Sequence, residues 1–235
     1  LMLVIGAMLL VAILTAIIVQ ILKGYFDFSI SHYFFGLFLF FQFPIWFTCV
    51  LAVFAQVLTG NRYIGMFIVV LYFASSIILP QLGFDHNLYL FATPGIPYSK
   101  FTGYGPNLSA YIWFSIYWSC FCIILLIAMH LLWQRGSEYT GRFSWGKIKP
   151  RFTPTVSAVS AISLIAFVAT GLFIFYNTNI LNKYRSALDL EASRADYEKS
   201  YKHYEDLLFP DITDMYVEVD IYPDSREAHI EGRYT

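Results

Sequence analysis

The stretch SAYIWFSIYWSCFCIILLIAMHLLW, residues 109–133, contains no Asp, Glu, Lys or Arg. A helix of this length covers the roughly 30 Å hydrocarbon core of a bilayer, because each residue adds about 1.5 Å. A charged side chain at the centre of a bilayer costs on the order of 2.5–3.5 kcal/mol by insertion scales. This stretch therefore predicts a membrane-spanning helix.

Charge is absent from four further stretches of similar length. The chain of 235 residues is 58% hydrophobic and only 13% charged, whereas a soluble domain usually carries about 25% charged residues. This composition excludes a soluble enzyme. The sequence predicts an all-α polytopic membrane protein with five transmembrane helices, and the transmembrane domain, residues 1–176, has its spans at about 1–22, 34–59, 64–83, 109–133 and 156–176.

The chain begins with Leu1 inside an apolar run, with no positive region before it and no small-residue cleavage site after it. The first stretch is therefore a poor signal peptide. We expect it to be a span, and we expect the chain to be part of a longer polypeptide.

The distribution of charge predicts the orientation. Residues 1–176 carry eight bases and three acids, a net charge of +5, whereas residues 177–235 carry seven bases and thirteen acids, a net charge of −6. Residues 134–155 contain five bases and one acid, which places this loop in the cytoplasm by the positive-inside rule. The turn at 60–63 is then also cytoplasmic, and the loops 23–33 and 84–108 and the region 177–235 lie outside.

The loop 84–108 is too apolar and aromatic for a solvated linker, and Pro94, Pro97 and Pro106 prevent one continuous helix. We expect a short element at the outer face of the bilayer or dipping into it. Backbone of this kind is tolerated at depth only where protein or water covers it.

Several polar or reactive residues within or beside the spans have two interpretations. Glutamines 20, 42 and 56 could line a pathway, but such groups more often hydrogen-bond across helices. Asp85, His86 and Asn87 could bind a metal or substrate, but a helix cap and loop staple is the commoner role. His130 is more often interfacial than a proton relay. Pro44 is predicted to kink the second span. The three cysteines are expected to act as small buried hydrophobes: Cys49, Cys120 and Cys122.

Residues 177–209 predict an extracytoplasmic juxtamembrane helix, running from about 180 to 208, with an apolar and aromatic stripe at i, i+3 and i+7 spacing. From residue 215 the apolar residues recur at every second position instead of at helical spacing. Residues 215–222 and 228–235 alternate between apolar and polar on either side of Pro223-Asp224-Ser225-Arg226. This pattern predicts a β-hairpin over 210–235. Because a lone hairpin is marginal in water, we expect it to be the first hairpin of a truncated extracytoplasmic β domain.

The sequence contains none of the common motifs for a catalytic zinc, a phosphate-binding loop, a dinucleotide site or a nucleophile elbow. Its five histidines are scattered, without a second ligand at metal spacing. We therefore assign no catalytic, cofactor-binding or metal-binding residue in this chain, and we expect no nucleic-acid partner.

Two runs resemble a known family. The run LGFDHNLYLFATPGIPYSKFTGYGPNLSAYIWFSIYW, residues 82–118, resembles the segment between late spans of bacterial proteins that fuse an ABC-type (type-2 exporter) permease to a zinc aminopeptidase of the aminopeptidase N class. The run FYNTNILNKYRSALDLEASRADYEKSYKHYEDLLFPDITDMYVEVDIYPDSREAHIEGRYT, residues 175–235, is similar to their connection into the peptidase β domain. The resemblance covers roughly residues 60–235.

The resemblance implies a permease-like domain in the bacterial cytoplasmic (inner) membrane that anchors an extracytoplasmic zinc aminopeptidase. The family's zinc ligands and catalytic Glu lie beyond Thr235, so zinc is expected only in that downstream domain, and whether the chain belongs to an enzyme depends on it. The implied partners are the lipid bilayer, a cytoplasmic ATPase subunit, and a second permease half in a homo- or heterodimer. Two alternatives stay open: a stand-alone permease subunit, and a scaffold without transport activity.

Overall fold

A computed structural model describes residues 2–105, 107–133, 149–205, 207, 211–225 and 227–235. The chain forms two compact units, Leu1–Leu190 and Glu191–Thr235. Most of the predicted basic loop at 134–155 lies outside the described residues.

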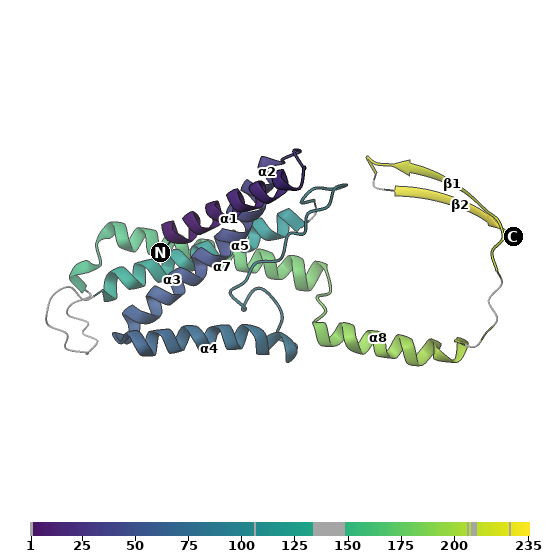
Figure 1. Cartoon of the computed structure of the whole chain (residues 1–235). Helices are drawn as coiled ribbons and strands as arrows, with labels where there is room; N and C mark the ends of the chain where they lie inside the picture. The colour runs from purple at the N-terminus through teal and green to yellow at the C-terminus, as the bar shows by residue number, and fades with distance from the viewer. Residues whose placement is uncertain (1, 106, 134–148, 206, 208–210, 226) are drawn as a thin grey trace. The chain divides into compact units, whose positions relative to one another are not determined.

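The described part of the first unit contains five helical segments that are long and apolar enough to cross a membrane. The main helices are α1 (Met2–Leu22), α3 (Gln42–Thr59), α4 (Arg62–Gln81), α5 (Asn107–Leu132) and α7 (Pro154–Phe175) (Figure 1). A short helix α2 (Ile30–His32) and a π-helical segment η1 (Tyr33–Phe41) lead into α3, and a second π-helical segment η3 (Tyr176–Leu181) extends α7. The five predicted stretches are therefore confirmed as helices of spanning length.

Local sequence explains the tight turn between α3 and α4. Gly60 ends α3 in the left-handed conformation, with φ 63°, which glycine adopts without steric cost. The Asn61 side chain then accepts a 2.9 Å hydrogen bond from the Tyr63 amide and caps α4. A similar start occurs at α7, where the Thr153 hydroxyl accepts from the Val156 amide and Pro154 occupies the first turn.

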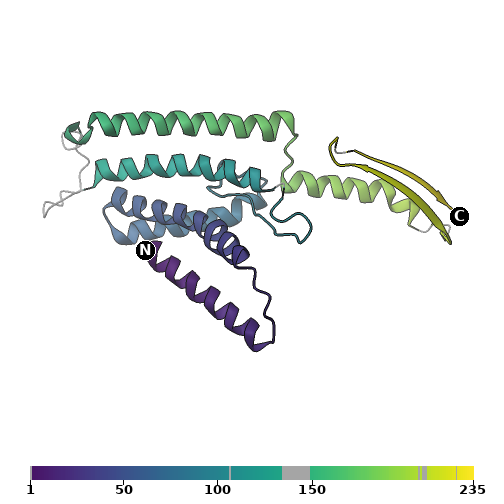
Figure 2. The same ribbon diagram turned by 90° about the horizontal axis from the view of Figure 1, so that it is seen from above.

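The bundle is centred on α5, which packs against α3 and α7, and α3 also packs against α4. In Figure 2, α5 and α7 run side by side. The helix α1 packs against η1 and α3. The buried core is largely aromatic where α3 meets α5, and its largest members are Phe47, Phe114, Tyr117 and Trp118. Many other apolar side chains are exposed, as expected for helices whose outward faces meet lipid.

The α3–α4 contact depends on Gly65. A Cβ at this position would lie 2.7 Å from Cγ and 2.9 Å from Cα of Gln56. Because one of these atoms is backbone, Gly65→Ala should push the helices apart and lower the free energy of unfolding by about 1–3 kcal/mol. Thermal unfolding in mild detergent measures this loss.

The matched control for Gly65→Ala is Gly95→Ala, where a Cβ would meet no atom of the described residues within 4 Å. Equal unfolding midpoints for the two variants would contradict the close α3–α4 approach.

The second predicted span is irregular at its beginning. Residues 33–41 form π-helical turns, and regular α-helix starts at Gln42. Pro44 lies in the first turn of α3, where the missing N–H of a proline costs little. The sequence predicted a kink at Pro44, but the departure from α-helical geometry lies before this residue.

The helix predicted over about 180–208 is wrong at its N-terminal end. Asn182 is extended, and the helix α8 covers only Ala187–Tyr201, followed by a 3₁₀ turn at Lys202–Tyr204. The Ser186 hydroxyl and the Asp189 carboxylate hydrogen-bond each other at 2.8 Å, and each also accepts from the other's backbone amide. This is a capping box, which starts a new helix. The predicted tyrosine stripe is present, because the rings of Tyr197 and Tyr201 lie 4.5 Å apart.

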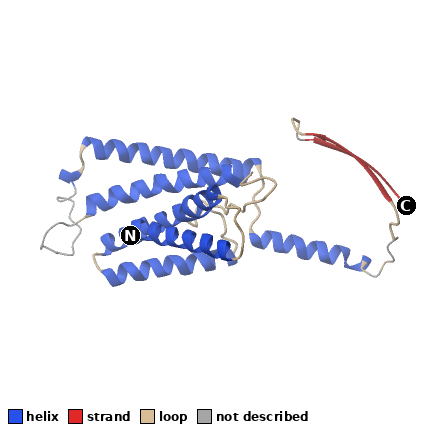
Figure 3. Cartoon of the chain, turned by 45° about the horizontal axis from the view of Figure 1, so that its top comes forward, coloured by secondary structure: helices blue, strands red, loops and turns tan. Residues whose placement is uncertain are grey.

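The second unit contains the predicted hairpin. Strands β1 (Met215–Tyr222) and β2 (Glu227–Tyr234) pair antiparallel (Figure 3). Val217 faces Gly232 and Val219 faces Ile230 in this register, so the alternating apolar residues share one face. Every described residue of the two strands is exposed.

Candidate functional site

The loop between α4 and α5, residues 82–105 (the α4–α5 loop), is folded into one end of the bundle. Figure 3 shows it among the helix ends. Phe91 is the only described non-glycine residue with positive φ, 53°, a conformation that costs a residue with a Cβ about 1–2 kcal/mol. Such strain persists only where surrounding contacts hold it.

The ring of Phe91 lies among aromatic side chains of three helices. Its centroid is 4.8 Å from that of Trp118 and 5.8 Å from that of Phe121, both on α5. Tyr72 of α4 and Phe47 of α3 follow at 6.0 and 6.1 Å. These edge-to-face and tilted contacts hold the loop in the bundle.

Side chains of α5 donate hydrogen bonds to three backbone carbonyls of the loop. The indole N–H of Trp118 donates to the carbonyls of Asn87 and Ala92, at 3.2 and 3.0 Å. The hydroxyl of Tyr117 donates to the carbonyl of Leu88 at 3.3 Å. Irregular backbone at membrane depth needs such partners, because lipid supplies none.

Asp85 ties the α4–α5 loop to the segment after α7. Its carboxylate accepts from the Tyr184 hydroxyl at 2.5 Å and from the Ala187 amide at 2.6 Å. Burial opposes ionisation of Asp85, but the hydrogen bonds from Tyr184 and Ala187, together with its own backbone amide and the charge of His86, hold the pKa of the carboxyl below its usual value. Burial and the Asp85 hydrogen bond both raise the pKa of Tyr184. The carboxylate therefore stays ionised and the phenol stays protonated.

His86 is buried, at 6% exposure, and both of its ring nitrogens are used. Nδ1 accepts from the Leu88 amide at 3.1 Å, so a neutral ring carries its proton on Nε2. Nε2 then donates to the Thr178 hydroxyl at 3.1 Å, and Thr178 donates to the Ile174 carbonyl. Burial lowers the pKa of His86, and the Asp85 carboxylate offsets this only in part.

The triplet predicted at residues 85–87 is therefore a loop staple. Asp85 and His86 bind the end of α7 and the residues after it, while Asn87 acts through its carbonyl. Among the described residues, no group of three or more His, Cys, Asp or Glu side chains could hold a metal ion.

The neutral state of His86 makes the bundle sensitive to acid. Its pKa in the folded protein lies below the ordinary value of 6.5, so below that pH the unfolded chain binds a proton that the folded chain does not. Stability should be complete above about pH 6.5 and should fall toward the lowered pKa, by at most about 1.4 kcal/mol per pH unit. Unfolding midpoints in detergent between pH 8 and pH 5 measure the slope.

His86→Gln should reduce this pH slope, whereas His203→Gln, at an exposed residue, should retain it. An identical slope in wild type and His86→Gln would contradict the assignment.

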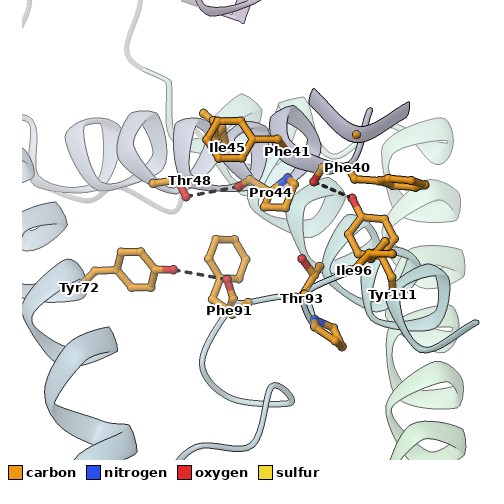
Figure 4. Close-up of a pocket in the computed structure, with 14 residues that line it drawn as sticks. Phe40, Phe41, Pro44, Ile45, Thr48, Tyr72, Phe91, Thr93, Ile96 and Tyr111 are labelled. Carbon is orange, nitrogen blue, oxygen red and sulfur yellow. Dashed lines mark hydrogen bonds between the residues drawn. The ribbon is translucent and has the colours of Figure 1, made fainter. Parts of the chain in front are cut away.

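A cavity of about 480 Å³ lies beneath the loop. We call it the loop cavity (Figure 4). Its walls are η1, the start of α3, one tyrosine each from α4 and α5, and the loop itself. The lining residues are all uncharged: Gly36, Phe40, Phe41, Pro44, Ile45, Thr48, Tyr72, Phe91, Ala92, Thr93, Pro94, Gly95, Ile96 and Tyr111. The volume falls in the range typical of small-molecule sites, roughly 300–1,000 Å³.

A second cavity, of about 500 Å³, lies between η1, α3 and α5. We call it the α3–α5 groove. Its lining is apolar apart from the hydroxyls of two serines and two tyrosines: Phe35, Leu39, Phe40, Phe43, Tyr104, Leu108, Tyr111, Ile112, Ser115, Ile116 and Ser119. Phe40 and Tyr111 line both cavities. The pair therefore forms a common wall.

Polar side chains also gather at the opposite end of α5. His130, Trp133 and Arg151 line a third cavity of about 560 Å³. Arg151 donates to the carbonyls of Leu131 and Trp133 at 3.0 and 2.5 Å, so its charge is placed at the C-terminus of α5, where a cation is favoured. His130 is exposed in the last turn of α5.

The three glutamines line neither of the two cavities next to the loop. Gln20 accepts a 2.7 Å hydrogen bond from Tyr33 across the α1–η1 contact, as the commoner interpretation predicted. Gln42 is 2% exposed and packs beside Gly6 of α1. Gln56 packs beside Gly65 of α4. Of the cysteines, Cys49 and Cys122 are buried, and Cys120 is half-buried.

Comparison with protein-family models, with curated proteins and with solved structures found no match. The geometry of the loop and its cavity therefore carries the functional argument.

Sequence reasoning missed Phe91, Tyr184 and the Phe40–Tyr111 wall. An aromatic residue in an aromatic-rich loop gives no periodic signal, and the contacts of Tyr184 with Asp85 join positions 99 residues apart. The capping box at Ser186 and Asp189 was the one available signal, since its S-x-x-D spacing marks a helix start.

Proposed function

We propose that this chain is the transmembrane part of an ABC-type exporter permease in a bacterial inner membrane. The observation that carries the proposal is the α4–α5 loop, fixed inside the helix bundle over an uncharged cavity. A passive anchor needs only apolar helices. A permease needs a hollow between its helices, with irregular backbone covered by protein.

The orientation of the proposed permease follows from charge. The basic segment 134–155 is cytoplasmic, and the α4–α5 loop and α8 are extracytoplasmic. A membrane-impermeant amine reagent applied to intact cells should label Lys183, which precedes α8, and should leave Lys149 unlabelled. Labelling of Lys149 alone would reverse the orientation.

A permease of this class needs an ATPase subunit on the cytoplasmic side. We expect one to copurify with the full-length protein in mild detergent, in contact with the α3–α4 turn. Arg62→Glu at the start of α4 should reduce the copurified ATPase, and Lys183→Glu should not. Absence of any ATPase from the wild-type preparation would overturn the transport proposal.

The alternative function is a membrane scaffold without transport. It is favoured by the closed wall between the two cavities, where the Tyr111 hydroxyl donates to the Phe40 carbonyl. A scaffold would show neither a bound ATPase nor ATP hydrolysis after reconstitution into liposomes.

We further propose that the chain anchors an extracytoplasmic zinc aminopeptidase-like domain. The support is the hairpin, whose apolar face is exposed on both strands and which needs further strands for stability. Reading the native polypeptide past Thr235 should reveal more strands and an H-E-x-x-H motif. A native polypeptide without that motif would remove the peptidase from the proposal.

A further inference from the structure

The loop cavity and the α3–α5 groove differ in chemistry although they share a wall. The groove is lined mainly by aromatic and aliphatic side chains such as Leu39, Phe43 and Ile116. The groove also contains two serines and two tyrosines, but it exposes almost no polar surface, whereas the loop cavity, with Thr48, Thr93 and Tyr72, is partly polar. One cavity therefore suits a hydrocarbon chain, and the other suits a group that makes hydrogen bonds.

The wall between the cavities is a weak contact. The Tyr111 hydroxyl donates to the Phe40 carbonyl at 3.3 Å, which is long for an O–H···O hydrogen bond. The two rings meet edge to face with centroids 5.2 Å apart. Phe40 belongs to the π-helical segment η1, and such turns often occur at functional sites. Phe40 and Tyr111 are the two side chains that both cavities share, so they alone separate the described linings.

Charge restricts what can bind. Among the residues that the structure describes, no charged side chain lines either cavity, and an ionised group buried without a partner is strongly disfavoured. A phosphate or carboxylate head is therefore excluded from the loop cavity, whereas a hydroxyl or an ester is accepted.

We propose that the two cavities form one binding site for an uncharged amphipathic lipid of the acylglycerol class. One acyl chain lies in the α3–α5 groove, which is formed by helical segments long and apolar enough to span a membrane. The hydroxyl and ester head lies in the loop cavity, against Thr93 and against Tyr72, whose hydroxyl already donates to the Phe91 carbonyl and is left to accept. Binding at this site does not require an ATPase or transport, so a negative result for either proposal leaves the other unchanged.

The test uses the full-length protein in nanodiscs and a diacylglycerol with a photoactivatable diazirine in one acyl chain. After irradiation, we expect the label on the helical segments that line the groove, at residues 35–43 and 108–119. Ile116→Trp should reduce labelling by about ten-fold, because the larger side chain takes up the space in the groove that the acyl chain needs. Thr93→Val should weaken binding by several-fold through the loss of one hydroxyl.

Ile123→Trp is the matched control. Ile116 and Ile123 are both on α5, with exposures of 41% and 40%, but Ile123 lines neither cavity. This variant should label as wild type does. Equal labelling of the two tryptophan variants would show contact with surrounding bilayer lipid only and would overturn the proposal. So would equal competition by an anionic phospholipid and by unlabelled diacylglycerol.

Discussion

Phe91→Ala is expected to release the α4–α5 loop from the bundle and to lower the free energy of unfolding by about 2–4 kcal/mol. Loss of a buried phenylalanine ring costs about 3–5 kcal/mol in protein cores, and Phe91 is half-buried. The ring contacts with Trp118, Phe121 and Tyr72 all disappear. Unfolding midpoints in detergent and tryptic cleavage at Lys100 measure the two effects.

The backbone of Phe91 adds a sharper expectation. Because φ is 53°, alanine keeps the strain of a Cβ in the left-handed region, and glycine removes it. Phe91→Gly should therefore be more stable than Phe91→Ala by about 1 kcal/mol, against the usual order of these residues.

Phe101→Ala is the control for both Phe91 variants, since Phe101 lies in the same loop and is 99% exposed. It should behave as wild type. If Phe101→Ala and Phe91→Ala were equally destabilised, the ring of Phe91 would not be what holds the loop.

Asp85→Asn is expected to loosen the segment between α7 and α8. The carboxylate accepts from two donors, Tyr184 and Ala187, and hydrogen bonds to charged groups contribute about 1.5–3 kcal/mol when buried. Because Asp85 is partly exposed, we expect about 1–2 kcal/mol after solvent screening. That loss should raise tryptic cleavage at Lys183 and Arg185 by about ten-fold, since cleavage follows the population of the open form.

The attachment through Asp85 should also resist mild acid. The pKa of Asp85 in the folded protein lies below the ordinary value of 3.8, so the attachment is fully present above that pH and is lost as the pH falls through the lowered pKa. Hydrogen exchange of residues 184–190, corrected for intrinsic rates, should show protection at pH 5 that declines only below pH 3.8.

Asp27→Asn removes the same charge from the segment between α1 and α2 and should change neither cleavage nor exchange at residues 184–190. Faster cleavage in this control would assign the effect of Asp85→Asn to net charge.

The helices and the hairpin were predictable because each depends on a periodic or compositional signal. Charge-free stretches of spanning length predicted the five helices, and alternation of period 2 predicted the paired faces of β1 and β2. The break before α8 was missed although Ser186 and Asp189 carry its signal, because an apolar stripe at helical spacing extends across it.

The candidate site was only partly predictable. A loop staple at Asp85 and His86 was the favoured interpretation, but their partners Tyr184 and Thr178 lie 99 and 92 residues away. No local pattern indicates which of several aromatic residues enters the bundle. That choice depends on the gap left by Phe47, Tyr72 and Trp118 on three helices.

The sequence alone determined that this chain has five helices of spanning length and a hairpin with one apolar face. Length, charge and hydrophobic period are properties of each segment by itself, and they decide whether that segment is stable in lipid or in water. Only the tertiary structure decided that the ring of Phe91 enters the bundle, that His86 is neutral with both ring nitrogens hydrogen-bonded, and that Phe40 and Tyr111 separate two cavities. These features depend on packing between distant segments, whose geometry is absent from any local pattern.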